Sequence, residues 1–255
     1  MTDDSVSVES PAFGPLRLEN STDSGSWATL RHQNERVDFD LGPVRRTYDI
    51  VAEDYASKFG DDLGDLPFDR SILDQVGQRG VAVDIGCGPG QVAADLADRG
   101  VEVAGIDISE GMLRVARRQY PSMRLTVADV RRLPLADTSC AAAVAFYSLQ
   151  YLPRPAIADT FAELHRVIEV DGLLIIAMHL GTGTVQSPTE WLGHQVESVT
   201  GTYYERGELE SLIERAGFRV LTTAERGPLP HEHQGDRAYI TAAAVTSPPS
   251  PRSRA

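Results

Sequence analysis

The chain has 255 residues, of which 42% are hydrophobic and 24% charged. This is enough chain for one well-buried core and too little for two, and the composition excludes collagen, coiled coil and wholesale disorder. A formal net charge of −13 argues against a nucleic-acid partner, because a polyphosphate backbone is bound by basic surfaces.

The first segment, residues 1–40, is rich in acidic residues and serine and poor in large apolar residues. Such a segment cannot bury much surface, so it is predicted to be disordered. Alternatively it could order as a lid over a bound ligand, anchored by Phe13, Leu16, Leu18, Trp27 and Leu30. Residues 41–246 are predicted to form one domain, and the proline-rich residues 247–255 a disordered tail.

Within 41–246, apolar runs of strand length alternate with amphipathic stretches of helical spacing, which is typical of a parallel sheet covered by helices. The expected helices are 44–59, 68–76, 91–99, 110–119, 155–169 and 208–216. The expected strands are 81–85, 101–106, 124–128, 141–146, 173–178, 218–223 and 238–245. Ser109 is expected to cap the helix over 110–119.

Residues 181–204 break this regularity with glycine, threonine and aromatic residues around a candidate helix over 189–199. Structureless connections of this length are usually functional or disordered in compact domains. We therefore expect an insertion that caps the active site, the alternative being a long plain connection.

The strand over 81–85 ends in Asp84-Ile85 and runs into Gly86-Cys87-Gly88-Pro89-Gly90 and a helix. Glycines let the main chain approach a ligand closely, and the amides of the turn and of the helix N-terminus face the crevice above the sheet. Gln91 stands where a dinucleotide fingerprint needs a small residue, and a phosphate-binding loop would need a lysine nearby. Asp84 would oppose a pyrophosphate but suit a cationic amino group. An amino-acid-bearing nucleoside fits this turn best.

Two further carboxylates follow at neighbouring strand ends. Asp107 ends the second expected strand, where it can accept hydrogen bonds from two ribose hydroxyls. Asp129 follows the third strand, where it could accept a hydrogen bond from the exocyclic amine of adenine. Three acidic residues therefore line one edge of the expected sheet.

From Val44 to Val245 the chain resembles the class I S-adenosylmethionine-dependent methyltransferases, in the branch that methylates small molecules. Residues 84–90 match the family's first motif, Asp107 its ribose-binding acid, 128–130 its adenine contact and 146–152 its fourth strand and following loop. Later, a helix containing 163–167 precedes Asp171-Gly172, where relatives usually have Pro-Gly or Gly-Gly; Asp171 should make a similar turn.

The resemblance implies an α/β, Rossmann-like, seven-stranded, mostly parallel sheet with helices on both faces and the last strand antiparallel. It implies S-adenosylmethionine as cofactor, with S-adenosylhomocysteine as product, and it allows a homodimer. The cofactor-binding residues it implies are Asp84, Gly86, Cys87, Gly88, Gly90, Asp107, Ile108, Met112, Asp129, Val130, Phe146, Gln150 and Tyr48. Tyr48 and Tyr55 match a pattern that covers the methionine end of the cofactor, although aromatic residues at helical spacing are often core residues.

A sulfonium methyl group is already electrophilic, so the enzyme must mainly align the acceptor and, where needed, remove its proton. Histidine suits the second task near neutral pH. His179, at the end of the fifth expected strand, is the first candidate for base or acceptor anchor, His231 in the loop 228–234 the second, and Tyr55 the third. Adjacent residues rarely converge on one ion, so a metal site at His231, Glu232 and His233 is disfavoured and no metal is expected.

The acceptor pocket is predicted to be lined by aromatic residues, which could instead be ordinary packing residues. They are Tyr147, Trp191, Tyr203 and Tyr204. The sequence Phe146-Tyr147-Ser148-Leu149 lacks the Asn/Asp-Pro-Pro-aromatic motif of enzymes that methylate bases or glutamine. It also lacks the acidic ligands of metal-dependent catechol-type enzymes.

The acceptor atom stays open among oxygen, nitrogen and carbon, including an indole carbon. Arginine-rich sequences with a single lysine, here Lys58, resemble those of actinobacterial specialised metabolism, which favours an aromatic or alkaloid-like natural product as acceptor. The alternatives are a non-catalytic S-adenosylmethionine-binding or regulatory protein and, less favoured, an NAD-dependent oxidoreductase.

Two cysteines, Cys87 and Cys140, are too few for a disulfide framework and fit a reducing cytoplasm. No apolar run approaches the roughly 20 residues that span a bilayer, and no secretion signal is recognised. We therefore expect a soluble, unexported, cytoplasmic protein without a membrane partner.

Overall fold

The computed structural model describes residues 39–246, apart from residues 61, 231, 233 and 234. Two predictions therefore fall almost wholly outside the described residues: the disordered or lid segment 1–40 and the tail 247–255. His231, the second candidate base, lies outside them as well.

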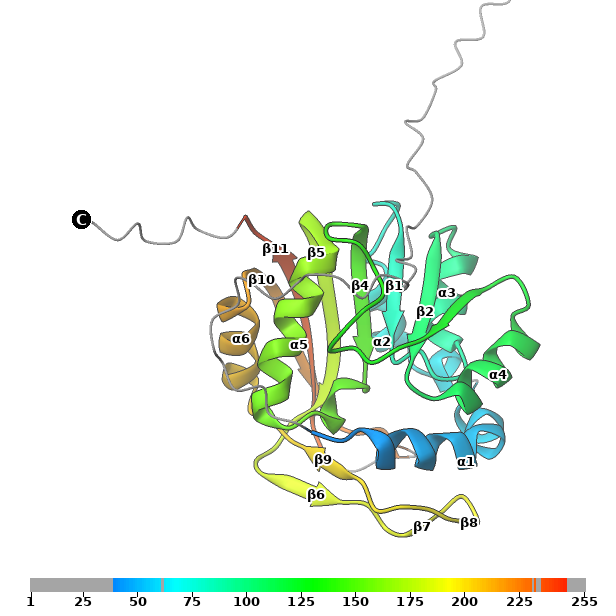
Figure 1. Cartoon of the computed structure of the whole chain (residues 1–255). Helices are drawn as coiled ribbons and strands as arrows, with labels where there is room; N and C mark the ends of the chain where they lie inside the picture. Colours follow the sequence, from blue (N-terminus) through cyan, green and yellow to red (C-terminus); the bar gives the residue numbers. More distant parts are fainter. Residues whose placement is uncertain (1–38, 61, 231, 233–234, 247–255) are drawn as a thin grey trace, which may run out of the picture.

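A seven-stranded sheet forms the centre of the molecule, in the order β10-β11-β5-β4-β1-β2-β3 (Figure 1). Its strands are β1 (Ala82–Ile85), β2 (Val103–Asp107), β3 (Arg124–Val127), β4 (Cys140–Phe146), β5 (Ile168–His179), β10 (Phe218–Arg226) and β11 (Arg237–Ala244). Strand β11 runs antiparallel to β5 and β10, whereas the pairs among β1 to β5 are parallel. The predicted Rossmann-like sheet with an antiparallel last strand is confirmed.

The helices cover both faces of the sheet, as predicted. They are α1 (Gly42–Phe59), α2 (Pro67–Leu73), α3 (Gln91–Asp98), α4 (Glu110–Gln119), α5 (Arg154–Val167) and α6 (Arg206–Arg215). Two 3₁₀ turns, η1 (Asp62–Asp65) and η2 (Leu149–Tyr151), connect them to their neighbours. The Ser109 side chain accepts a hydrogen bond from the Met112 N–H at 3.1 Å, so the predicted cap of α4 is present.

Alternate residues of the central strands enter two different cores, because successive side chains of a strand point to opposite faces. In β4, Ala143 and Ala145 pack on the face covered by α5 and α6, whereas Ala142 and Val144 pack on the face covered by α2 and α3. Strand β5 alternates in the same way. This explains why these strands are apolar along almost their whole length.

Strand β5 begins earlier than predicted, at Ile168 instead of residue 173. Ile168 pairs with Cys140, and the register then shifts before Ala142 pairs with Leu173. Asp171, at φ 63°, sits in this irregularity. The expected turn at Asp171-Gly172 is therefore a bulge within a continuous strand, and the chain enters it directly from α5.

The predicted helix over 189–199 is wrong. The segment instead forms two short antiparallel pairs, β6 (Thr184–Gln186) with β9 (Thr200–Thr202) and β7 (Glu190–Trp191) with β8 (His194–Gln195). Leu192 and Gly193 both have positive φ, at 51° and 80°, and make a two-residue hairpin turn. We call residues 184–202 the β ribbon; it lies along α1 at one end of the sheet (Figure 1).

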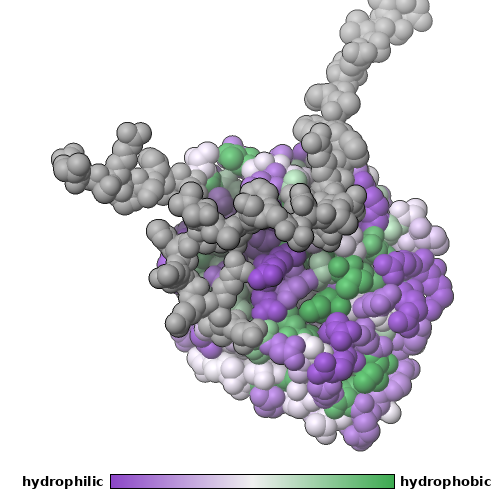
Figure 2. Space-filling view, viewed as in Figure 1, coloured by the Kyte–Doolittle hydropathy of each residue, from purple (hydrophilic) through white to green (hydrophobic). Residues whose placement is uncertain are grey.

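On the face seen in Figure 2, hydrophobic residues form small patches among hydrophilic ones. The exposed large apolar side chains of the described residues come from separate elements, for example Ile50 of α1, Val185 of β6 and Leu221 of β10. Single exposed apolar residues are ordinary on a monomer surface. Within the described residues, no helix is both long and apolar enough to cross a membrane.

Candidate cofactor and acceptor site

The glycine turn after β1 holds three residues in left-handed conformations, Gly86 at φ 68°, Gly88 at 54° and Gly90 at 95°. A Cβ on Gly86 would lie 2.2 Å from the Cβ of Ser148, so the turn packs directly against the loop after β4. A Cβ on Gly88 would meet no atom within 4 Å. The turn is therefore tight at Gly86 and open at Gly88, which lines a cavity.

Asp107, at the end of β2, faces this turn. Its Oδ2 accepts a hydrogen bond from the Gly88 N–H at 2.8 Å, and its Oδ1 accepts one from the Ser109 N–H at 2.8 Å. Burial raises the pKa of Asp107 above its ordinary range, opposed by these backbone hydrogen bonds. Each carboxylate oxygen keeps a further lone pair, so Asp107 can accept two more hydrogen bonds from a ligand.

Helix α1 is locked beside Asp107 by Asp49. One Asp49 oxygen accepts hydrogen bonds from the Ser109 hydroxyl at 2.7 Å and from the Gly111 N–H at 2.8 Å, at the first turn of α4. A Cβ on Gly111 would lie 2.7 Å from the Asp49 Cα. This close contact fixes where Tyr48 and Tyr55 of α1 stand over the cavity.

Asp84 lies at the floor of the same site and is 1% exposed. Its Oδ2 accepts a hydrogen bond from the Ala93 N–H at 3.1 Å, in the first turn of α3. Burial raises the pKa of Asp84 to about 7, because a charged carboxylate is poorly solvated there. A cationic group of a ligand would restore the charged form.

This raised pKa predicts a pH-dependent stability. The unfolded chain holds Asp84 at an ordinary pKa of about 3.9, so between about pH 4 and 7 the folded state binds more protons and the free energy of unfolding falls as pH rises. Asp84→Asn keeps an acceptor for the Ala93 N–H and removes the titration. In urea unfolding measured from pH 4 to 8, the free energy of unfolding of the variant should rise relative to that of the wild type as pH increases. The slope should be at most about 1.4 kcal/mol per pH unit, and the total difference up to a few kcal/mol. Parallel curves would contradict a buried, titrating Asp84.

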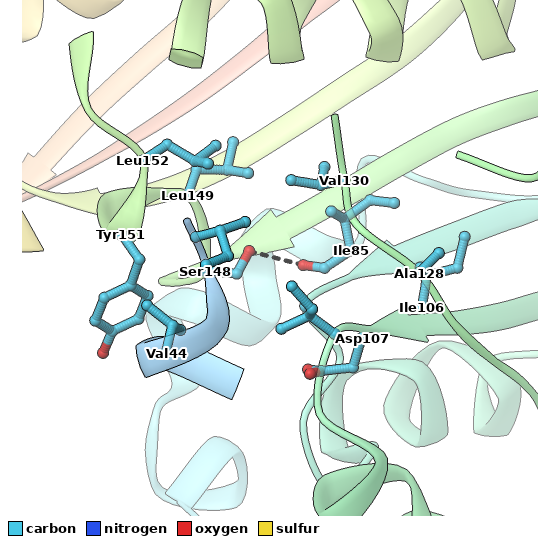
Figure 3. A pocket seen from close by; sticks show the side chains of 13 residues that line it. Val44, Ile85, Ile106, Asp107, Ala128, Val130, Ser148, Leu149, Tyr151 and Leu152 are labelled. Atoms are coloured by element: carbon cyan, nitrogen blue, oxygen red, sulfur yellow. Dashed lines mark hydrogen bonds between the residues drawn. The ribbon is translucent and has the colours of Figure 1, made fainter. Parts of the chain in front are cut away.

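Two adjoining cavities open at the carboxyl ends of the parallel strands, where ligands of open α/β sheets bind. The smaller one, about 60 Å³, is mainly apolar and is drawn in Figure 3, with Asp107 at its rim and the Ser148 hydroxyl donating to the Ile85 carbonyl at 2.7 Å. The larger cavity is about 410 Å³. Residues that line both include Gly86, Asp107 and Ile108, so the two meet at Asp107.

The β ribbon and α1 make an aromatic wall of the larger cavity. The Trp191 ring stands edge-on to the rings of Tyr48 and Tyr55, with centroids 5.5 and 5.8 Å away. Polar contacts hold the ribbon on α1: Arg46 with Glu197, the Thr47 hydroxyl with the Glu197 carbonyl at 3.0 Å, and His194 with Asp54 at 2.7 Å.

The far end of the larger cavity is polar. Asp69 of α2 is 1% exposed and accepts hydrogen bonds from Tyr147, Tyr239 and Arg226. Arg226 also binds both oxygens of Glu232, at 2.6 and 2.7 Å, and this pairing lowers the pKa of Glu232 to about 2. His179 lies beside Tyr147, with ring centroids 5.2 Å apart.

Most of the predicted site residues meet around these cavities. Those lining the larger cavity are Tyr48, Tyr55, Asp84, Gly86, Cys87, Gly88, Asp107, Ile108, Met112, Phe146, Tyr147, Gln150, His179 and Trp191. Val130 lines the smaller one. Gly90 lines neither; it caps α3, and a Cβ there would press on Tyr120 and Met123 at 3.2 and 3.3 Å.

Besides Gly90, three predicted contacts are not brought to the cavities. Asp129 is clasped by the guanidinium of Arg131, at 2.6 to 3.0 Å, whereas its neighbours Ala128 and Val130 line the smaller cavity. Tyr204 is 0% exposed in the core, where its hydroxyl donates to the Leu152 carbonyl. Tyr203 contacts the ring of His179, with ring centroids 6.4 Å apart, but is not part of the cavity lining.

Several lining residues were not predicted as part of the site. Leu41 and Val44 line the smaller cavity from the start of α1, and Asp69, Glu232 and Arg237 form the polar end of the larger one. Asp69 follows Pro67, so its sequence context is an ordinary helix start. Glu232 has a recognisable context in its loop between histidines, but the sequence suggests for it only a disfavoured metal site.

Comparison with known proteins gives a consistent result. A family model described as a methyltransferase domain matches residues 82–172. A demethylmenaquinone methyltransferase from Beutenbergia cavernae is 35% identical over 148 residues, which are 56% of this chain and 60% of that protein. The chain spans between 36% and 60% of the length of the first curated relatives it matches.

Solved structures share the fold. An S-adenosylmethionine-dependent methyltransferase from Methanosarcina mazei superposes with a TM-score of 0.61 at 19% identity, covering 68% of this chain and 97% of that chain. The [4+2]-cyclase SpnF has a TM-score of 0.61 at 18% identity, covering 79% of this chain and 96% of that one. The matched domain, the sheet order and the glycine turn make this chain similar to the class I S-adenosylmethionine-dependent methyltransferases.

Proposed function

We propose that the protein binds S-adenosylmethionine and transfers its methyl group to a small molecule. The observation that carries this proposal is Asp107, which two backbone N–H groups orient at the point where an apolar pocket meets a larger polar and aromatic cavity. Asp107 would accept the ribose hydroxyls, and Ile108 and Val130 would contact the adenine in the smaller cavity. The cofactor supplies an electrophilic methyl group on a sulfonium.

The residues at the other side of Asp107 suit the methionine end of that cofactor. The Oε1 atoms of Gln91 and Gln150 are buried in the lining of the larger cavity and have no hydrogen-bond partner among the described residues. Buried amide oxygens without partners are costly, and a ligand amino group would satisfy them. Asp84 would add charge for the same group, and Gly88 leaves open space for the ligand.

The remaining part of the cavity would hold the acceptor, between the aromatic wall and the polar end. His179 lines it at the tip of β5 and would act as general base or as an anchor for the acceptor. We favour an aromatic or alkaloid-like natural product as acceptor. The Beutenbergia relative, named for demethylmenaquinone, supports a small-molecule acceptor.

The direct test is to incubate extracts with labelled S-adenosylmethionine and to search by mass spectrometry for a molecule that gains a methyl group. The wild type should label a small molecule, and Asp107→Ala should not. Labelling of protein or nucleic acid, or labelling that survives in the variant, would contradict the proposal.

A second candidate is a protein that binds the cofactor without transferring its methyl group. The observation in its favour is that the [4+2]-cyclase SpnF has the same fold, and a fold does not fix a reaction. Tight S-adenosylmethionine binding without label transfer in the same extracts would favour this candidate.

If the β ribbon caps the acceptor site, a change in the ribbon should weaken acceptor binding and leave cofactor binding intact. Trp191→Ala removes an aromatic wall of the acceptor space, so KM for the acceptor should rise by about tenfold, the effect of losing roughly 1.4 kcal/mol of contact. The affinity for S-adenosylmethionine should stay within about threefold. Val185→Ala, on the exposed outer strand of the same ribbon, is the matched control and should change neither. Equal losses of acceptor and cofactor affinity in Trp191→Ala would contradict the cap.

A further inference from the structure

Three oxygen-bearing groups form a closed triangle at the polar end of the larger cavity. The Tyr147 hydroxyl lies 2.9 Å from the Asp69 Oδ2, the Tyr239 hydroxyl 2.8 Å from the Asp69 Oδ1, and the two hydroxyls lie 2.7 Å apart. All three contacts are within hydrogen-bond distance. Asp69 and Tyr147 line the cavity, whereas Tyr239 is 1% exposed and stands behind them.

The protons of this triangle can be counted. Each tyrosine brings one hydroxyl hydrogen, and an ionised carboxylate brings none. Arg226 donates to the Asp69 Oδ1 at 2.9 Å, so a guanidinium also contacts this carboxylate. Two protons therefore serve three oxygen–oxygen contacts, and a third proton on Asp69 would complete a ring of hydrogen bonds.

The backbone at Tyr147 is set to aim its ring at this triangle. Tyr147 follows the last residue of β4 and has φ 56°, which a residue with a Cβ seldom adopts and which costs of order 1 kcal/mol. Its N–H still donates to the Ala177 carbonyl at 2.8 Å, so the strand pairing continues while the side chain turns toward α2 and β11. Strained conformations of this kind concentrate at functional sites.

The surroundings decide what the Tyr147 hydroxyl can do. Burial, with the Asp69 charge second, holds the pKa of Tyr147 well above its usual range, so this hydroxyl stays protonated and cannot store a negative charge. The Tyr147 hydroxyl can donate its own proton to Asp69 while its oxygen accepts a proton from a bound molecule. The other charged or titratable groups around the triangle are Arg226, Glu232, His179 and Arg237.

The same end of the cavity indicates the class of acceptor. The carboxylates of Asp69 and Glu232 are both paired with Arg226, so an acceptor ammonium would have to compete with a guanidinium for them. The aromatic wall of the same cavity offers the rings of Tyr55, Phe59 and Trp191. A neutral aromatic ring that carries a hydroxyl matches both walls.

We infer that the acceptor is a hydroxylated aromatic molecule and that Tyr147 relays its proton to Asp69; this rests on the proposed methyl transfer. The acceptor oxygen forms a bond to the methyl carbon as the carbon–sulfur bond breaks, and the electron pair of that bond stays on sulfur. The acceptor proton moves to the Tyr147 oxygen, and the Tyr147 proton moves to Asp69. The sulfonium and the carboxylate are neutralised together, so the cavity gains no net charge.

The test compares two matched variants, Tyr147→Phe and Tyr239→Phe, which each remove one hydroxyl from the same triangle. Methyl transfer from labelled S-adenosylmethionine is measured with phenol and with 4-nitrophenol in mildly alkaline buffer, where only the second is ionised. With phenol, Tyr147→Phe should lower kcat by about 100-fold, the usual size of general acid–base help, and Tyr239→Phe by less than about threefold. With 4-nitrophenol, which needs no base, both variants should stay within about threefold of wild type.

Thermal unfolding and calorimetry with S-adenosylmethionine accompany each assay. Both variants should unfold at similar temperatures and bind the cofactor like wild type. If kcat falls equally in the two variants, or if Tyr147→Phe lowers kcat equally with both phenols, the triangle has only a structural role and the relay is overturned. Wild type that binds the cofactor but methylates neither phenol would overturn the hydroxylated acceptor, whereas a failure to bind the cofactor would overturn the proposed function itself.

Discussion

Alanine in place of Gly88 is expected to leave the protein folded and to weaken S-adenosylmethionine binding by about 100-fold or more. A Cβ at this position would meet no protein atom within 4 Å, because it would point into the space proposed for the cofactor. At φ 54° the left-handed conformation should cost alanine about 1 to 2 kcal/mol of stability. Calorimetry gives the affinity, and thermal unfolding confirms the fold.

The matched control is Gly183→Ala. Gly183 also has a left-handed φ, 78°, and open space where a Cβ would lie, but it directly precedes the β ribbon and is outside the cavity lining. It should show a similar loss of stability and normal cofactor affinity. Cofactor binding that survives in Gly88→Ala, or that is lost equally in Gly183→Ala, would contradict the position proposed for the cofactor.

Asp107→Ala is the second change with a large expected effect. It removes both proposed ribose hydrogen bonds to a charged acceptor, so the Kd for S-adenosylmethionine should rise by roughly 10² to 10⁴-fold, at about 1.5 to 3 kcal/mol for each bond. The N–H groups of Gly88 and Ser109 also lose their partner, so thermal unfolding must be measured beside calorimetry. Asp107→Asn, which keeps one side-chain oxygen, should lose less affinity.

Asp129→Asn is the control for this prediction. Its carboxylate also follows a parallel strand, but Arg131 holds it and the smaller cavity is lined by its neighbours instead. Its effect on S-adenosylmethionine affinity should stay within about threefold. A loss as large as that of Asp107→Ala would restore the adenine contact expected for Asp129 from the sequence.

The contrast between these two aspartates illustrates which parts of the site sequence reasoning can find. Asp84, Gly86, Gly88 and Asp107 follow directly from the ends of two strands and one turn, and local pattern is enough to place them at one edge of a parallel sheet. The direction of the Asp129 side chain depends on Arg131, two residues further on, which the strand pattern does not show.

The same distinction applies to the fold. Helices and strands with a clear period were predicted with ends shifted by a few residues, because burial on one or two faces leaves its pattern in the sequence. The β ribbon was predicted as a helix, since its apolar residues are few and its short strands are determined by the turn at Leu192-Gly193 and by contacts with α1. Tyr204 was assigned to the acceptor pocket, although it packs in the core next to α5 and α6.

The polar end of the cavity could not be assembled from sequence. Asp69, Tyr147, Arg226 and Tyr239 come from α2, the loop after β4, β10 and β11, and each is unremarkable beside its own neighbours. These residues lie close together because a crossover places β11 beside β5 and because α2 packs against β11. Long-range pairing of this kind has no local sequence signal.

The central claim, that the crevice at Asp107 is an S-adenosylmethionine site, is tested most directly by calorimetry of the wild-type protein with S-adenosylmethionine and NAD in parallel. Binding of S-adenosylmethionine at one site per chain without binding of NAD is the predicted result. Tight binding of NAD without binding of S-adenosylmethionine would contradict it.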